Sequence, residues 1–180
     1  MDEILGTLQG IHDTHKPAVD LGCGIVRDDD FISVDRYGEC TVRADVTALP
    51  FKTGSIGYFL ANNLLEHLTP MEAQAALTEW KRALKPGGKI IVMVPAVDLL
   101  MDLWAVPENH DKVDIFNDIM GKVYAVHDKP GMGHKWGYTV QSLALAIHGA
   151  GFKIRHLWTH FPERPTINCT VIGEKALECA

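Results

Sequence analysis

The chain has 180 residues, of which 47% are hydrophobic and 22% charged, and its formal net charge at pH 7 is −6. A chain of this length can bury one sizeable core, so we expect a single domain over residues 1–180, and the acidic balance disfavours nucleic acid as a partner. No apolar run approaches the ~20 residues that cross a bilayer, and the acidic start MDEILGTLQG lacks the basic residues of a signal peptide, so we expect a cytoplasmic protein without a membrane partner.

Short apolar runs indicate seven strands, as expected where helices cover the faces of a parallel sheet. They span residues 18–21, 31–35, 41–44, 56–61, 89–94, 152–158 and 167–173. The alternation of these runs with helical patterns predicts an α/β fold, and the turn-like HFPERP near the end predicts a late antiparallel strand.

Two helices are indicated by capping signals. Thr69 and Glu72 form a predicted capping box, Pro70 suits the first helical position, and Pro86-Gly87-Gly88 is expected to end this helix. A second helix is expected from Val140 to His148. Residues 95–138 form a connection too long for a regular α/β unit, so we expect an insertion on the substrate side there.

The stretch VDLGCGIVRDDDFISVD, residues 19–35, predicts strand, glycine loop, strand, with only nine residues, 22–30, in between. So short a connection has room for about one helical turn, so the usual helix is expected to be shortened or absent. The dinucleotide fingerprint also needs a third glycine where Arg27 stands, which disfavours a nicotinamide-dependent oxidoreductase.

Asp20-Leu21-Gly22-Cys23-Gly24 matches a D-x-G-x-G motif, and FISVD, ADVTALPF, NNLLEHL and LKPGGKIIVMVP follow in order. Together these motifs resemble those of class I S-adenosylmethionine-dependent methyltransferases, over roughly residues 18–173. The shortened first connection and the later HKWGYT are similar to small bacterial and phage members. Gly57 departs from the pattern, because the superfamily usually carries an acid at this position.

The resemblance implies a Rossmann-like three-layer sandwich, a mostly parallel seven-stranded sheet and S-adenosylmethionine as cofactor. Glycines let the backbone approach the methionyl part closely, and a carboxylate at a strand end offers acceptors to ribose hydroxyls. The residues expected at the cofactor are Asp20, Gly22, Cys23, Gly24, Asp35, Asp45, Val46 and Asn62.

Methyl transfer from a sulfonium requires an aligned nucleophile and, where needed, a base. His67 in NNLLEHL and His134 in HKWGYT are the candidate bases, each with a purely structural role as the alternative. We expect no metal, because the spaced pairs His12/His15 and His156/His160 lack further ligands at recognisable spacing.

The fourth predicted strand ends in Asn62-Asn63-Leu64-Leu65, without the [DNS]-P-P-[YFW] sequence associated with methylation of nucleic-acid bases. With the acidic net charge, this favours an O or N nucleophile on a small-molecule or sugar-containing acceptor. The alternative hypothesis is a non-catalytic methyltransferase-like module that binds a protein partner and needs no cofactor.

Overall fold

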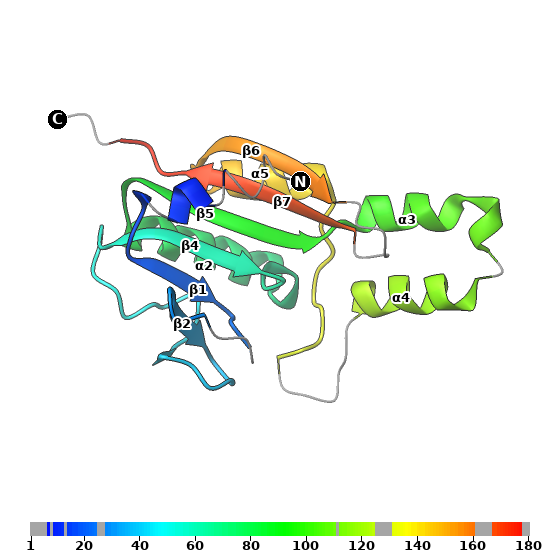
Figure 1. Cartoon of the computed structure of the whole chain (residues 1–180), viewed down its shortest axis with the longest axis horizontal. Helices are drawn as coiled ribbons and strands as arrows, with labels where there is room; N and C mark the ends of the chain where they lie inside the picture. Colours follow the sequence, from blue (N-terminus) through cyan, green and yellow to red (C-terminus); the bar gives the residue numbers. More distant parts are fainter. Residues whose placement is uncertain are drawn as a thin grey trace.

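The computed structural model describes residues 7, 9–12, 14–24, 28–110, 112–124, 131–160 and 167–177. Seven strands form one sheet in the order β3-β2-β1-β4-β5-β7-β6 (Figure 1). β7 runs antiparallel to β5 and β6, and the other neighbouring pairs are parallel, which confirms the predicted α/β sheet with a late antiparallel strand. The strands are β1 Ala18–Leu21, β2 Ile32–Asp35, β3 Val42–Arg43, β4 Ile56–Asn62, β5 Leu84–Pro95, β6 Lys153–His160 and β7 Asn168–Glu174.

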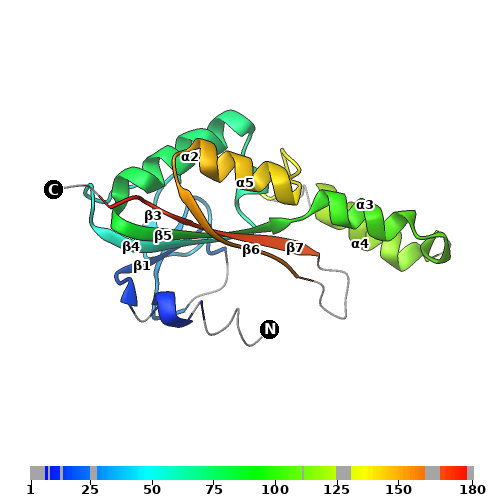
Figure 2. The same ribbon diagram turned by 90° about the horizontal axis from the view of Figure 1, so that it is seen from above.

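Helices α2 and α5 cover one face of this sheet (Figure 2). Helices α3 and α4 lie side by side beyond the carboxyl end of β5, so the predicted insertion is largely helical. No helix among the described residues is long and apolar enough to cross a membrane. The helical elements are η1 Leu65–His67, α2 Pro70–Ala83, α3 Val97–Ala105, η2 Pro107–Asn109, α4 Val113–Tyr124 and α5 Val140–Gly149.

Helix α2 begins as predicted, with the capping box between Thr69 and Glu72. Its end differs from the prediction, because the helix stops at Ala83 and the chain enters β5 at Leu84, before Pro86. Backbone N–H groups of the loop before β4, at residues 54 and 55, donate to the carbonyls of Arg82 and Ala83. These bonds satisfy carbonyls that a longer helix would use, and Leu84 pairs with Ile56 at the sheet.

The connection between β1 and β2 carries no helix in its described residues, which are Gly22 to Gly24 and Asp28 to Phe31. Gly22 and Gly24 have φ angles of +68° and +59°, which favour glycine, and they turn the chain directly after β1. The connection between β2 and β3, residues 36–41, is also short and non-helical. The sheet therefore brings the end of β2 beside the glycine loop, where Asp35 accepts from the Gly24 N–H.

Gly57 allows the chain before β1 to approach the start of β4. Its N–H donates to the carbonyl of Pro17 at 2.8 Å, and a Cβ at Gly57 would collide with the backbone carbonyl of His15. On this face Ile11 packs with Tyr58 in a small buried cluster. Close backbone packing is thus a physical reason for glycine, rather than an acid, at position 57.

Candidate functional site

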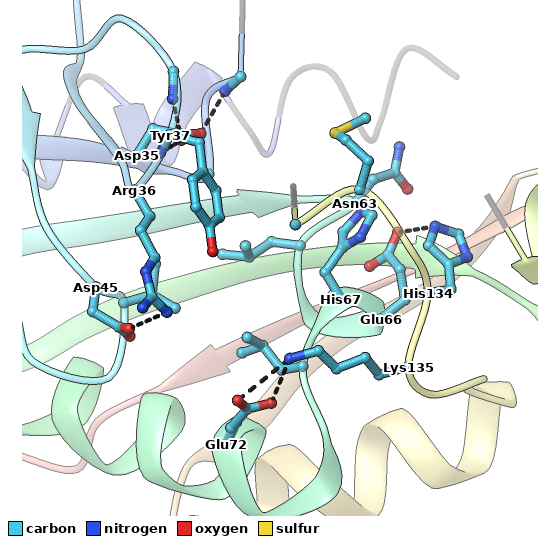
Figure 3. Close-up of a pocket in the computed structure, with 18 of the residues that line it drawn as sticks. Asp35, Arg36, Tyr37, Asp45, Asn63, Glu66, His67, Glu72, His134 and Lys135 are labelled. Atoms are coloured by element: carbon cyan, nitrogen blue, oxygen red, sulfur yellow. Dashed lines mark hydrogen bonds and ion pairs between the residues drawn. The ribbon is translucent and has the colours of Figure 1, made fainter. Parts of the chain in front are cut away.

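A cavity of about 730 Å³ lies at the carboxyl ends of the parallel strands. Its walls include Gly22 and Gly24 after β1 and residues within 35–38, 45–47, 63–68 and 131–135. The cavity has two ends (Figure 3). The aspartate end holds Asp35, Arg36, Tyr37 and Asp45. The histidine end holds Glu66, His67 and His134.

Asp35 joins the end of β2 to the glycine loop. Its Oδ2 accepts a hydrogen bond from the Gly24 N–H at 3.0 Å, and its Oδ1 accepts from Tyr37 and Gly38 N–H groups, both at 2.7 Å. Burial raises the pKa of this carboxyl, but the backbone donors outweigh burial and hold the pKa below its ordinary value. Asp35 is therefore an anion with a fixed orientation at the cavity wall.

Asp45 and Val46 form the next part of the aspartate end. The Oδ1 of Asp45 accepts from the N–H and hydroxyl of Thr47, and its Oδ2 pairs with Arg36 at 3.1 Å. Donors on Thr47 lower the pKa of Asp45. The carbonyl of Val46 accepts from the indole N–H of the fully buried Trp80 on α2, at 2.9 Å. Helix α2 thereby fixes the position of this loop.

The histidine end is assembled from two segments far apart in the sequence. The N–H groups of Lys135 and Trp136 donate to the carbonyl of Glu66 at 2.8 and 3.1 Å, which ties residues 131–136 to η1. The rings of His67 and His134 consequently meet edge to face, with centroids 4.7 Å apart. The side chain of Lys135 turns away and pairs with Glu72 at 3.0 Å (Figure 3).

Glu66 is buried at this end, and neither of its carboxylate oxygens has a hydrogen-bond partner among the described residues. The nearest ring nitrogen, Nε2 of His134, is 3.9 Å from Oε1, which is within ion-pair range but too long for a hydrogen bond. Burial raises the pKa of Glu66 to about 8. Burial also lowers the pKa values of His67 and His134, so both imidazoles are neutral at pH 7.

Asp20 lies in β1 between Ser33 of β2 and Leu60 of β4. Burial raises its pKa to about 6, and the charges of Asp28 and Asp35 add to the effect. In contrast to Asp35, this carboxyl is therefore partly protonated just below neutral pH.

Most of the predicted cofactor residues meet at one cavity. Gly22, Gly24, Asp35, Asp45 and Val46 line it, whereas Asp20, Cys23 and Asn62 are not among its lining residues. Both predicted bases, His67 and His134, line the opposite end.

Of the two asparagines at the end of β4, Asn63, with φ of 50°, lines the cavity, whereas the predicted Asn62 does not. Sequence reasoning did not find two further contacts. The ring of Tyr37 contacts Gly131, where a Cβ would come within 2.6 Å of the ring. Gly38 is also needed, because a Cβ there would lie 2.6 Å from the carbonyl oxygen of Gly24. Of these, only the glycine in RYGE, directly after the strand, was a signal that sequence reasoning could have used.

Comparisons with known proteins agree with this geometry. Residues 26–92 match the family model of a methyltransferase domain. A search of curated proteins found no match.

Solved structures with the same fold include an S-adenosylmethionine-dependent methyltransferase from Methanosarcina mazei, with a TM-score of 0.63 and 16% identity over 89% of this chain and 92% of the other. The 1,6-didemethyltoxoflavin-N1-methyltransferase of Burkholderia thailandensis, solved with its substrate and S-adenosylhomocysteine, has a TM-score of 0.61 and 14% identity, over 88% and 70% of the two chains. A possible histamine N-methyltransferase from Thermotoga maritima has a TM-score of 0.58 and 19% identity, over 95% and 88%.

A Rossmann-like sheet with a glycine loop after β1 and an acid at the end of β2 gives this chain the fold of S-adenosylmethionine-dependent methyltransferases. The match to the methyltransferase-domain model, over residues 26–92, agrees with this fold. S-adenosylmethionine is the cofactor of this class, and the Burkholderia structure contains its demethylated product.

Proposed function

We propose that this protein transfers the methyl group of S-adenosylmethionine to an O or N nucleophile of a small-molecule acceptor. One observation carries the proposal: a single cavity connects the aspartate end to the histidine end. A cavity of about 730 Å³ falls in the range of ~300–1,000 Å³ that is usual for small-ligand sites.

In this proposal the adenosine lies at the aspartate end. A carboxylate has about four acceptor positions, and three of those on Asp35 are used by backbone N–H groups. The remaining position, on Oδ2, is available to a ribose hydroxyl. The adenine ring would lie on Val46, beside the carboxylate of Asp45. The methionyl part would follow the glycine loop toward Asn63, so the methyl group would point to the histidine end.

The sulfonium is already activated, so the protein mainly has to align the acceptor with the methyl carbon. A neutral imidazole, His67 or His134, can accept the acceptor's proton as the new bond forms. Burial keeps both rings neutral, which supports this role. The proposal requires no covalent intermediate.

Calorimetric titration with S-adenosylhomocysteine is the first test, on the wild type and on Asp35→Ala. We expect saturable binding that weakens at least tenfold in the variant, because the ribose acceptor and the anchor of the glycine loop are both lost. Asp102→Ala, on an exposed residue of α3, is the matched control and should bind normally.

Release of S-adenosylhomocysteine from S-adenosylmethionine, with a panel of hydroxyl and amine acceptors, then tests transfer. A folded wild type that binds neither S-adenosylmethionine nor S-adenosylhomocysteine at about 1 mM, where the binding free energy is only ~−4 kcal/mol, would contradict the proposal. That result would instead favour a methyltransferase-like module that binds a protein partner.

A further inference from the structure

The histidine end brings three metal-ligating side chains together. One ligand atom from each of Glu66, His67 and His134 lies within 4.8 Å of the others. Two of the residues come from η1 and the third from the segment that hydrogen-bonds to it, so backbone contacts hold the set in place. All three residues line the cavity, which leaves one side of the cluster open to a ligand.

Each histidine ring has one nitrogen directed at backbone. Nδ1 of His67 is 3.3 Å from the carbonyl of Gly133. The backbone at Lys122 and Val123 raises the pKa of the His134 ring, although burial lowers it overall, and Nε2 of this ring faces Oε1 of Glu66 at 3.9 Å. A carbonyl only accepts, so the proton belongs on the nitrogen that faces it, and the other nitrogen carries a lone pair. This is the arrangement that fixes metal-binding histidines.

Nε2 of His134 faces the buried side chain of Glu66. Glu66 is 98% buried, and both of its oxygens are without a hydrogen-bond partner in the described part of the chain. Lys135 pairs with Glu72, and Lys122, whose charge lowers the pKa of Glu66, forms no ion pair with it among the described residues. An ionised carboxylate buried without a partner is destabilised, so a cation among the three side chains would stabilise this form of Glu66.

We propose that Glu66, His67 and His134 bind one divalent transition-metal ion, such as Zn²⁺, at the histidine end of the cavity. Two imidazoles and one carboxylate are a known three-ligand set for Zn²⁺, with a fourth position open to water or substrate. Tetrahedral metal–ligand bonds of about 2.1 Å place ligand atoms ~3.4 Å apart, so the cluster, whose ligand atoms lie within 4.8 Å of one another, must close by up to about 1.4 Å around the ion. Mg²⁺ prefers oxygen ligands and should bind more weakly.

The ion would also narrow the class of acceptor. A hydroxyl oxygen bound at the open position loses its proton near neutral pH, so an acceptor with a metal-binding hydroxyl is favoured over an amine. This part rests on the proposed methyl transfer. The oxygen–carbon bond forms as the sulfur–carbon bond breaks, the sulfonium becomes a neutral thioether, and the proton passes to solvent. His67 and His134 then act as ligands instead of bases.

Metal binding is tested without any acceptor. The full chain, freed of metal with a chelator, is titrated with Zn²⁺ by calorimetry and with Co²⁺ by visible absorption, which reports coordination geometry. We expect one tight site per chain, and at least tenfold weaker binding in His134→Ala and in Glu66→Gln. His156→Ala is the control, because His156 is an exposed histidine on β6, stacked on Trp158. It should leave the site unchanged.

Circular dichroism and thermal unfolding of each metal-free variant show whether it is folded, and S-adenosylhomocysteine is titrated into the same samples. Glu66→Gln is the second variant because it keeps the side-chain shape if His134→Ala unfolds. Zn²⁺ binding that is absent, or unchanged in both folded variants, overturns the metal site even if S-adenosylhomocysteine binds. Site-specific Zn²⁺ binding without S-adenosylhomocysteine binding supports the metal site and contradicts the proposed methyl transfer.

Discussion

Two aspartates on neighbouring strands, Asp20 of β1 and Asp35 of β2, have opposite pKa shifts. Asp35 accepts three backbone N–H groups, which stabilise its anion. The pKa of Asp20 is raised, mainly by burial and also by the negative charges of Asp28 and Asp35, because all three disfavour its anion. The same type of side chain therefore has a different electrostatic role on each strand, set by the donors that surround it.

Replacing Asp20 by Asn should stabilise the protein at pH 7. The pKa of Asp20 is about 6 in the folded protein, against 3.8 for the ordinary group, so the folded state holds the proton more tightly and stability falls as pH rises between these values. Because the group is partly exposed, solvent screening reduces the expected gain to about 1 kcal/mol. Urea unfolding of the wild type and of Asp20→Asn at pH 7.5 and pH 4 measures this difference in the free energy of unfolding. The difference should vanish at pH 4. A variant less stable than wild type at pH 7.5 would contradict the assignment.

Replacing Gly38 by Ala should weaken cofactor binding. A Cβ at Gly38 would lie 2.6 Å from the Gly24 carbonyl oxygen and 3.3 Å from Cγ of Asp35, so the glycine loop has to move. We expect at least tenfold weaker S-adenosylhomocysteine binding by calorimetry, which is ~1.4 kcal/mol. Gly149→Ala, where a Cβ meets no atom within 4 Å, is the control and should bind normally. Equal affinity in both variants would show that the loop tolerates displacement.

At the scale of elements, helix α2 has a function beyond covering the sheet. Its Trp80 holds the Val46 carbonyl, and a second contact comes from Glu79, whose Oε1 accepts from the Leu49 N–H at 2.9 Å. Arg82 pairs with Glu79 and donates to the Phe51 carbonyl at 2.8 Å. One helix thus fixes both ends of the loop that carries Asp45 and Val46.

Replacing Trp80 by Phe should destabilise the protein by about 1–3 kcal/mol, because the buried Val46 carbonyl loses its donor. The midpoint of urea unfolding measures the change. S-adenosylhomocysteine should also bind more weakly, since the loop is no longer fixed. Trp136→Phe is the matched control at an exposed position, 49% accessible. A Trp80→Phe variant as stable as this control would show that the indole hydrogen bond is dispensable.

In the whole molecule, the proposed binding cavity and the close backbone contact at Gly57 lie at opposite ends of the strands. The cavity lies at the carboxyl ends, and Gly57 lies near the amino end of β4, against the backbone of His15. Replacing Gly57 by Ala should lower stability by about 1–3 kcal/mol, through a forced backbone shift. Differential scanning calorimetry should show a loss of ~2–4 °C per kcal/mol. S-adenosylhomocysteine affinity should change little. Gly10→Ala, which adds a Cβ in open space, is the control.

Local patterns were sufficient to predict much of this fold. The capping box at Thr69, the strand around Asp20 and the absence of a helix from the described residues between β1 and β2 depend on neighbouring residues and chain length, so local sequence predicts them. The end of α2 was misplaced because it depends on an earlier loop, whose Gly54 N–H caps the carbonyl of Arg82, 28 residues later.

The candidate site likewise has residues that the sequence predicted and contacts that only the tertiary structure shows. The resemblance of local motifs to those of a known superfamily indicated Asp35, Asp45 and the two histidines. Only the tertiary structure placed His134 beside Glu66, 68 residues earlier, because backbone hydrogen bonds between distant segments have no signature in sequence spacing. The burial that leaves the Glu66 carboxylate without a donor is likewise a property of the assembled chain. Local patterns and the resemblance of the motifs therefore predicted the sheet and the class of cofactor, whereas packing between distant segments decided which side chains meet at the histidine end.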